Sequence, residues 1–183
     1  IDAKRIAQGA TGRNSGFNVG FDLPDFTGDG AGGAMAKFLA QTAVDKAGAE
    51  ENQRLIETLG IECDFRADGF SYAVRDPSRF QEAEAYAGVL KLVGATARIL
   101  DAEDCRKSFG TDFYTRTLWI GGGGNGFLQP AKFSKGLVDT LPAQVEVYEN
   151  TPALGLQPQP GGGALVEVAQ GRIKAARVIL ALN

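Results

Sequence analysis

Histidine is absent from this 183-residue chain, and its absence excludes several kinds of catalytic site. Neither a Ser-His-Asp triad nor a Cys-His pair can be assembled from these residues. A zinc or non-haem iron site is also disfavoured, because imidazole is a common ligand of both metals. We therefore expect no metal site, and we expect any redox chemistry to depend on an organic cofactor.

Cysteine, long apolar runs and positive charge are also scarce. The two cysteines, Cys63 and Cys105, lie far apart without C-x-x-C spacing, so we expect reduced structural thiols and a cytoplasmic protein. No apolar run approaches the roughly 18 residues that a membrane span needs, and the chain start lacks the features of a signal peptide. The net charge of −3 offers no basic surface for nucleic acid, so we expect no nucleic-acid partner and no membrane span.

Glycine, in contrast, is abundant. The chain contains 25 glycines, with clusters at 28–33, 121–126 and 161–163, which indicate turns and close backbone approaches. The cluster at 121–126 lacks the Lys-Ser/Thr pair that follows a phosphate-binding loop, so a bulge or hairpin is expected there. The apolar fraction of 44% and the charged fraction of 22% are typical of a globular protein with an ordinary core.

Hydrophobic periodicity predicts a mixed α/β fold. Helical spacing with start and stop signals is expected at 35–59, 78–93, 102–107 and from Pro130 onward. Strands are expected at 69–74, 97–100, 114–120, 145–148, 165–169 and 178–182. The first three should pair in one mainly antiparallel sheet, while the unbroken apolar run at 178–182 is typical of a parallel strand buried on both faces of another sheet.

Several short motifs follow one another in a family-specific order. Asp2 precedes a Gly-Ala-Thr-Gly-Arg-Asn-Ser-Gly turn at Gly9–Gly16, and later motifs occur at 69–73, 126–130, 145–153 and 181–183. In this order they resemble the glycine/D-amino-acid oxidase family of FAD-dependent oxidoreductases. The Gly-Arg-Asn turn is most similar to the branch that contains γ-glutamylputrescine oxidoreductases.

The resemblance implies a domain organisation. A partial Rossmann-like FAD-binding domain would occupy residues 1–33, an α+β substrate domain 34–130, and a return to the FAD-binding domain 131–183. The G-x-G-x-x-G half of the FAD signature would lie upstream of Ile1, so the chain is expected to be an internal piece of a longer enzyme. Alone, it should be colourless and inactive.

The resemblance also implies cofactor contacts. Asp2 would bind the adenosine ribose, Arg5 would lie near the adenine, and the remaining positions would line the pyrophosphate and flavin: Ala10, Thr11, Arg13, Asn14, Gly16, Ala153, Ala181 and Asn183. Gln129 would point toward the flavin from the substrate side. No catalytic side chain is assigned.

Simpler structural interpretations stay open for these residues. Asp2 would equally be a solvated acid, Arg13 and Asn14 part of an ordinary turn, and Gln129 a polar residue before a helix-opening proline. Three arginines, Arg66, Arg75 and Arg98, either bind a substrate carboxylate or lie on the surface. Two aromatic residues, Phe70 and Tyr72, either belong to the core or form a cage for an ammonium group.

The function that the resemblance implies is oxidation of the C–N bond of an amine or amino acid, with hydride transfer to FAD and release of an imine that hydrolyses. Two alternatives remain. The same fold oxidises 2-hydroxy acids, which would require a base that this His-free chain does not supply. A binding module without catalytic activity is the other alternative.

Overall fold

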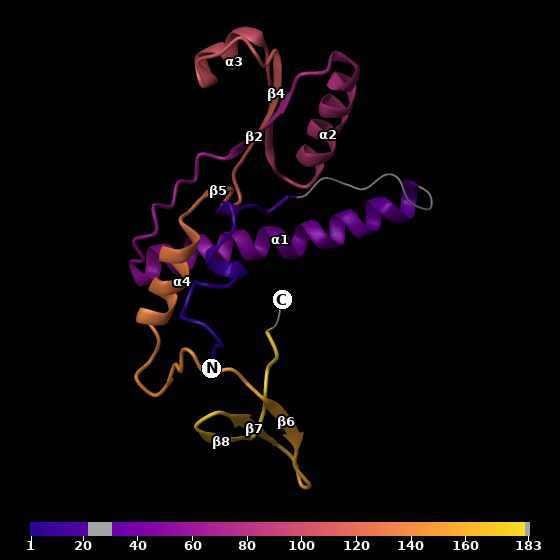
Figure 1. The fold of residues 1–183 in the computed structure, drawn as a ribbon. Coiled ribbons are helices and arrows are strands. Elements are labelled where there is room, and N and C mark those ends of the chain that lie inside the picture. The colour runs from indigo at the N-terminus through magenta and orange to yellow at the C-terminus, as the bar shows by residue number, and fades with distance from the viewer. Residues whose placement is uncertain (22–30, 182–183) are drawn as a thin grey trace. The chain divides into compact units, whose positions relative to one another are not determined.

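A computed structural model describes residues 1–21 and 31–181, and they form two compact units. The first unit comprises residues 1–15, 61–63 and 129–183, and the second comprises residues 16–60 and 64–128. Figure 1 labels most of the helices and strands and colours the chain by residue number. The chain thus passes from the first unit to the second and back twice.

A three-stranded antiparallel sheet forms the centre of the second unit. Strands β2 (Phe70–Val74) and β3 (Thr96–Leu100) both pair with β4 (Arg116–Gly121), in the order β2-β4-β3. The register places Tyr72 of β2 and Ile99 of β3 opposite Leu118. The sheet predicted from segments 69–74, 97–100 and 114–120 is therefore confirmed.

Helix α2 (Phe80–Leu92) covers one face of this sheet, beside β2 and β4 in Figure 1. Leu90 on the helix and Leu118 and Ile120 on β4 are at most 1% exposed. Phe70 and Tyr72 lie on the same face of β2, Phe70 in the core and Tyr72 packed against it. Burial of these apolar side chains holds the helix to the sheet.

Local capping signals fix where the helices begin and end. The Asp76 carboxylate accepts a hydrogen bond from the Ser78 amide at the 3-10 turn η2 (Pro77–Arg79), which leads into α2. Asp101 caps α3 (Ala102–Phe109) through the amide of Asp104, and Gly110 ends it with φ +67°. These are the residue types that such positions favour.

Helix α1 (Ala31–Leu59) completes the second unit together with a two-stranded ladder. The helix ends at Gly60, which has φ +64°, as the predicted stop signal requires. Strand β1 (Phe17–Asn18) pairs antiparallel with β5 (Gly126–Phe127). The glycine cluster at 121–126 forms the turn between β4 and β5. The hairpin expected there is wrong, because β4 pairs with β2 and β3 whereas β5 pairs with β1.

Within residues 1–181, the first unit contains one α-helix, a 3-10 turn and a small sheet. These are η1 (Ala10–Gly12), α4 (Pro130–Asp139), β6 (Gly155–Pro158), β7 (Ala164–Val168) and β8 (Gly171–Ala175). The strands form a β6-β7-β8 meander with antiparallel pairing throughout. The Pro-Gly stretch at 158–163 closes the first hairpin of this meander.

Two predicted strands are wrong. Segments 145–148 and 178–181 are not strands, and Ile179 and Leu180 are 91% and 65% exposed. Their apolar and β-branched residues favour extended backbone, but a strand also needs a hydrogen-bonded neighbour. Among residues 1–21 and 31–181, no strand lies beside either segment.

The mixed α/β class with antiparallel sheets is confirmed, and no parallel strand pair occurs in the described parts of the chain. Within the same parts, none of the helices combines the length and apolar character that crossing a bilayer requires.

Candidate functional site

The N-terminal segment of the first unit is attached to residues 148–151 by backbone hydrogen bonds. The Asp2 amide donates to the Tyr148 carbonyl at 2.9 Å, and the Asp2 carbonyl accepts from the Thr151 amide at 2.7 Å. The Asn150 amide donates to the Lys4 carbonyl at 3.1 Å. Two segments about 150 residues apart are thereby joined, although neither is a regular strand.

The Asp2 side chain is exposed and only partly engaged. Its Oδ1 atom accepts a hydrogen bond from the Lys4 amide at 2.7 Å, which orients the carboxylate. Its Oδ2 atom has no hydrogen-bond donor within the described part of the chain. Asp2 therefore presents one oriented oxygen that can accept further hydrogen bonds.

A tight turn follows, and its shape depends on glycine and asparagine. Ala7 has φ +66°, and a Cβ at Gly12 would overlap the Ala7 carbonyl oxygen, so only glycine fits there. The Asn14 amide Nδ2 donates to the carbonyls of Ala10 and Thr11 at 3.2 and 2.8 Å. As the first residues of η1, Ala10 and Thr11 carry amides that have no acceptor inside the helix.

Charged side chains surround this turn. Arg5 and Arg13 are exposed, and Arg5 borders a cavity of about 480 Å³ within the first unit. The cavity also contains the Lys135–Asp139 ion pair of α4, with N–O distance 3.0 Å. Nearby, the Glu149 carboxylate accepts from the Ile6 amide at 2.6 Å. A polar hollow thus adjoins the segment that carries Asp2.

Gln129 is the N-cap of α4. Its Oε1 atom accepts from the amides of Ala131 and Lys132 at 2.7 and 3.2 Å, and Pro130 occupies the first helical position. Its own amide donates to the Cys63 carbonyl at 2.7 Å. The side-chain oxygen is therefore committed to the helix, which leaves the Nε2 group for any other partner.

The other predicted cofactor positions belong to both units. Gly16 belongs to the second unit, is buried with φ +77°, and accepts from the Leu128 amide at 2.8 Å. Ala153 and Ala181 are exposed in the first unit, and Ala153 lies two residues after the Asp2-bound Thr151. Asn183 lies outside the described residues.

The second unit has a separate cavity of about 500 Å³ with an aromatic lining. It lies on the sheet face opposite α2 and is bordered by Phe17, Ser71, Phe109, Trp119 and Phe127. The Trp119 indole is fixed, because its Nε1 donates to the Asp68 carbonyl at 3.1 Å. Arg98 stacks on the same ring, 4.4 Å from its centre.

The other predicted substrate residues have structural partners. Arg66 forms an ion pair with Asp68 at 2.9 Å, and Arg75 stacks over Phe113 at 4.6 Å. Both side chains are exposed, and their guanidinium groups are engaged within the second unit. These contacts agree with the surface interpretation of both residues, while a substrate role for either stays a prediction.

Sequence reasoning missed a buried amide cluster in the second unit. Asn18 is 4% exposed and donates to the carbonyls of Ala49 and Gly124 at 2.9 and 2.8 Å. Asn125, 1% exposed, accepts from the Gly20 amide at 2.7 Å. The sequence signal for this cluster was the neighbours of the two asparagines: Asn18 lies between two apolar residues and Asn125 between two glycines. An amide side chain in such surroundings can be buried and bonded to the backbone.

Comparison with known proteins identifies the family. Residues 1–183 match the sequence profile described as FAD dependent oxidoreductase, DAO. The chain belongs to this FAD-dependent oxidoreductase family. The resemblance inferred from the motifs is therefore confirmed.

Relatives of this DAO-family chain include a curated protein and several solved structures. Gamma-glutamylputrescine oxidoreductase of Escherichia coli K12 is 27% identical over 194 residues, an alignment that covers 100% of the chain and 42% of that protein. Glycine oxidase from Geobacillus kaustophilus has a TM-score of 0.70 at 16% identity, covering 98% of the chain and 47% of the oxidase. L-amino acid deaminase from Proteus vulgaris gives 0.68 at 18% identity, covering 96% and 44%. The chain thus spans less than half the length of these relatives.

Proposed function

We propose that this DAO-family chain is part of an FAD-dependent oxidoreductase that oxidises the C–N bond of an amine or amino acid. The observation that carries the proposal is the match of residues 1–183 to an FAD-dependent family, together with the oriented, partly free carboxylate of Asp2. The relatives named above act, by their names, on an amine, glycine and L-amino acids.

The donor set around the N-terminal turn suits the nucleotide half of FAD. The free Oδ2 of Asp2 would accept hydrogen bonds from ribose hydroxyl groups. The amides of Ala10 and Thr11, with the exposed Arg13, offer donors for the pyrophosphate. Gly12 allows the backbone to keep this shape, because any side chain there would overlap Ala7.

The remaining predicted positions contribute less specific contacts. Arg5 would lie beside the adenine or its ribose, and Asn14 would hold the turn through its bonds to two carbonyls. Contacts from Gly16, Ala153, Ala181 and Asn183 would be made by backbone or small groups. Gln129 would use Nε2 toward the flavin, since its Oε1 caps α4.

Bound FAD would supply the two-electron acceptor, so the side chains of this chain need only bind, orient and desolvate the substrate. The aromatic cavity of the second unit suits that task, because Phe17, Trp119 and Phe127 line it with apolar surface. Ser71 adds a hydroxyl at its edge. We propose this cavity as the part of the substrate-binding surface that these residues provide.

The test compares Asp2→Asn with the unchanged full-length protein that carries this segment. Replacing the carboxylate by an amide retains the local bond to the Lys4 amide but removes the charge-assisted bonds to ribose. These are worth about 1.5–3 kcal/mol, so FAD affinity should fall about ten- to a hundredfold. Released flavin measured by fluorescence during dilution or dialysis gives the affinity directly.

Asp76→Asn is the matched control, because Asp76 also accepts from an amide two residues further on and lies in the other unit. It should retain FAD like the unchanged protein. Equal FAD affinity in Asp2→Asn and Asp76→Asn would contradict the ribose role.

Substrate panels distinguish the proposed reaction from its alternatives. Turnover of amines or amino acids, with release of the carbonyl product, supports C–N oxidation. Turnover of 2-hydroxy acids alone would favour hydroxy-acid dehydrogenation, and FAD binding without any turnover would favour a binding module. We also propose that residues 1–183 alone retain no FAD, which a flavin absorbance band in the purified chain would contradict.

A further inference from the structure

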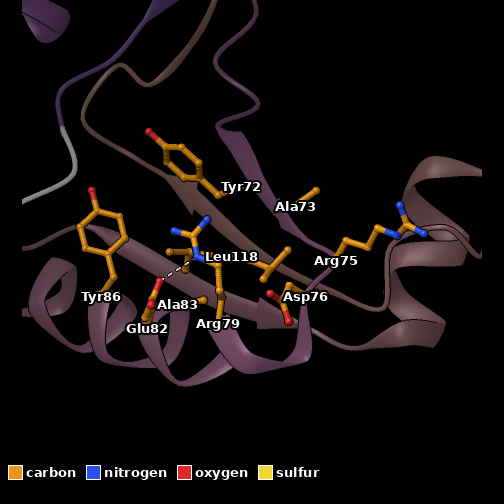
Figure 2. Close-up of a pocket in the computed structure, with 10 residues that line it drawn as sticks. Tyr72, Ala73, Arg75, Asp76, Arg79, Glu82, Ala83, Tyr86 and Leu118 are labelled. Atoms are coloured by element: carbon orange, nitrogen blue, oxygen red, sulfur yellow. Dashed lines mark hydrogen bonds and ion pairs between the residues drawn. The ribbon is translucent and has the colours of Figure 1, made fainter.

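A cavity of about 450 Å³ lies between β2 and the start of α2 in the second unit, on the sheet face opposite the aromatic cavity. Its floor is apolar and buried, with Ala83 at 8% and Leu118 at 1% exposure. Figure 2 shows Tyr72 and Tyr86 on one side of it, and their ring centroids are 6.5 Å apart. A hollow of this size with a mostly apolar lining is typical of small-molecule sites.

The rim of the cavity carries four charged side chains, and each of them has a partner. Asp76 caps the start of the helix, and the Ser78 amide lowers the pKa of its carboxyl group. Arg75 stacks over Phe113. Glu82 binds the Nε atom of Arg79 at 2.9 Å.

Arg79 is engaged on one edge only, although its charge also helps to lower the pKa of the nearby Asp76 carboxyl group. Glu82 engages its Nε edge, and no other hydrogen bond or ion pair involves its guanidinium in the part of the chain that the structure describes. In Figure 2 the two Nη atoms point up, on the side where the Tyr72 and Tyr86 rings stand. Glu82 therefore orients a planar pair of N–H donors beside an apolar cavity.

Such a pair matches a carboxylate, which binds arginine through two parallel hydrogen bonds. The rim residues comprise two cations and two anions: Arg75, Asp76, Arg79 and Glu82. Because the two carboxylates on the rim repel a dianion more strongly than a monoanion, a ligand with one negative charge suits the site better than a dianion. The tyrosine rings and Leu118 would contact the body of the ligand.

We propose that this cavity binds a small organic monocarboxylate with an aromatic or branched apolar body. Its carboxylate is held by the Nη atoms of Arg79, and its body lies against Tyr72, Tyr86 and Leu118. The proposal rests on the second unit alone and is independent of the proposed oxidase function.

The experiment titrates the ¹⁵N-labelled 183-residue chain with benzoate and follows amide chemical shifts. Saturable shifts should centre on Ala83, Tyr86 and Leu118. Benzamide, benzylamine and phenyl phosphate carry a similar ring with a neutral, cationic or dianionic group, and each should bind more weakly than benzoate. Binding of benzylamine or phenyl phosphate as tight as that of benzoate, or shifts centred elsewhere, would overturn the proposal.

Two substitutions test the arginine. Arg79→Gln should weaken benzoate binding about tenfold or more, because it removes both charge and fork. Arg79→Lys keeps the charge but not the fork, so its benzoate affinity should lie between that of the unchanged chain and that of Arg79→Gln. Arg54→Gln is the matched control, since Arg54 pairs with Glu51 at the same i,i+3 spacing on α1. Equal benzoate affinity in Arg79→Gln and Arg54→Gln would refute the role of Arg79. The side chains of Arg54 and Arg79 are both exposed, so neither substitution should disturb folding, and unchanged urea midpoints would verify this.

Discussion

Replacing Asn18 by alanine should destabilise the second unit strongly, because this buried side chain joins three parts of it. Asn18 Nδ2 donates to the carbonyls of Ala49 on α1 and Gly124 in the turn before β5. Its Oδ1 accepts from Asn52 Nδ2 at 2.9 Å. The substitution removes all three bonds at a position that is 4% exposed.

The size of the effect follows from the number of bonds lost. Each hydrogen bond contributes about 0.5–1.5 kcal/mol net, and buried groups left without partners cost at least as much. Three bonds therefore give a loss of about 2–4 kcal/mol in the free energy of unfolding. With a urea m-value of about 2 kcal/mol/M, the unfolding midpoint should fall by about 1–2 M.

Urea denaturation followed by tryptophan fluorescence measures this loss. Trp119 is the single tryptophan of the chain and lies in β4 of the same unit, so its emission reports the unfolding of the second unit. The m-value should stay constant if stability alone changes.

Gln41→Ala is the matched control. Gln41 also lies in the second unit and donates one hydrogen bond, to Asp45 at 2.7 Å, but its side chain is exposed on α1. An exposed substitution of this kind should change stability by less than about 0.5 kcal/mol. If Asn18→Ala costs no more than Gln41→Ala, the amide cluster does not hold the unit together.

Four further outcomes are expected. Gly69→Ala should lower the free energy of unfolding by about 1–2 kcal/mol or more, because Gly69 has φ +75° and a Cβ there would overlap the Ile120 carbonyl oxygen. Gly88→Ala on α2 should raise the free energy of unfolding by about 0.5–1 kcal/mol, because nothing lies within 4 Å of the added Cβ and alanine favours a helix. Urea denaturation measures both changes. The hydrogen bond from the Ser78 amide lowers the pKa of the Asp76 carboxyl group in the folded chain, so the stabilisation by this carboxylate is present above its unfolded-state pKa and is lost as the pH falls. The difference in urea midpoint between the unchanged chain and Asp76→Asn should therefore shrink from about pH 6 to about pH 3. A difference that stays constant would show that the charge of Asp76 does not contribute to the cap. Cys63 and Cys105 are at most 1% exposed, so a thiol reagent should label neither in the native chain and both in denaturant; fast native labelling would contradict their burial.

Local signals in the sequence were sufficient for several helix boundaries, although α1 begins at Ala31 rather than at residue 35 and α3 ends at Phe109 rather than at residue 107. Asp76 and Asp101 cap the segments that follow them, and Gly60 ends α1 with φ +64°. Each of these interactions joins residues only a few positions apart, so neighbouring sequence contains both partners. The same holds for Gln129, whose position before Pro130 indicated a helix start.

The antiparallel sheet was also predictable, since its three strands follow one another in the chain, with α2 between the first two and α3 between the last two. The predicted cofactor residues are only partly brought together. Asp2 is joined to Thr151, two residues before Ala153, but no sequence pattern indicated the backbone hydrogen bonds that join Asp2 to Thr151. Whether these residues contact FAD stays a prediction.

Tertiary structure decided the rest. The runs at 145–148 and 178–181 have strand-like composition yet form no strand in the described residues, because a strand exists only where another strand supplies hydrogen-bond partners. Asn18 reads as an ordinary loop residue, but its two acceptors lie 31 and 106 residues further along the chain. Capping depends on neighbours in sequence, whereas pairing and buried hydrogen bonds depend on partners that only the folded chain brings together.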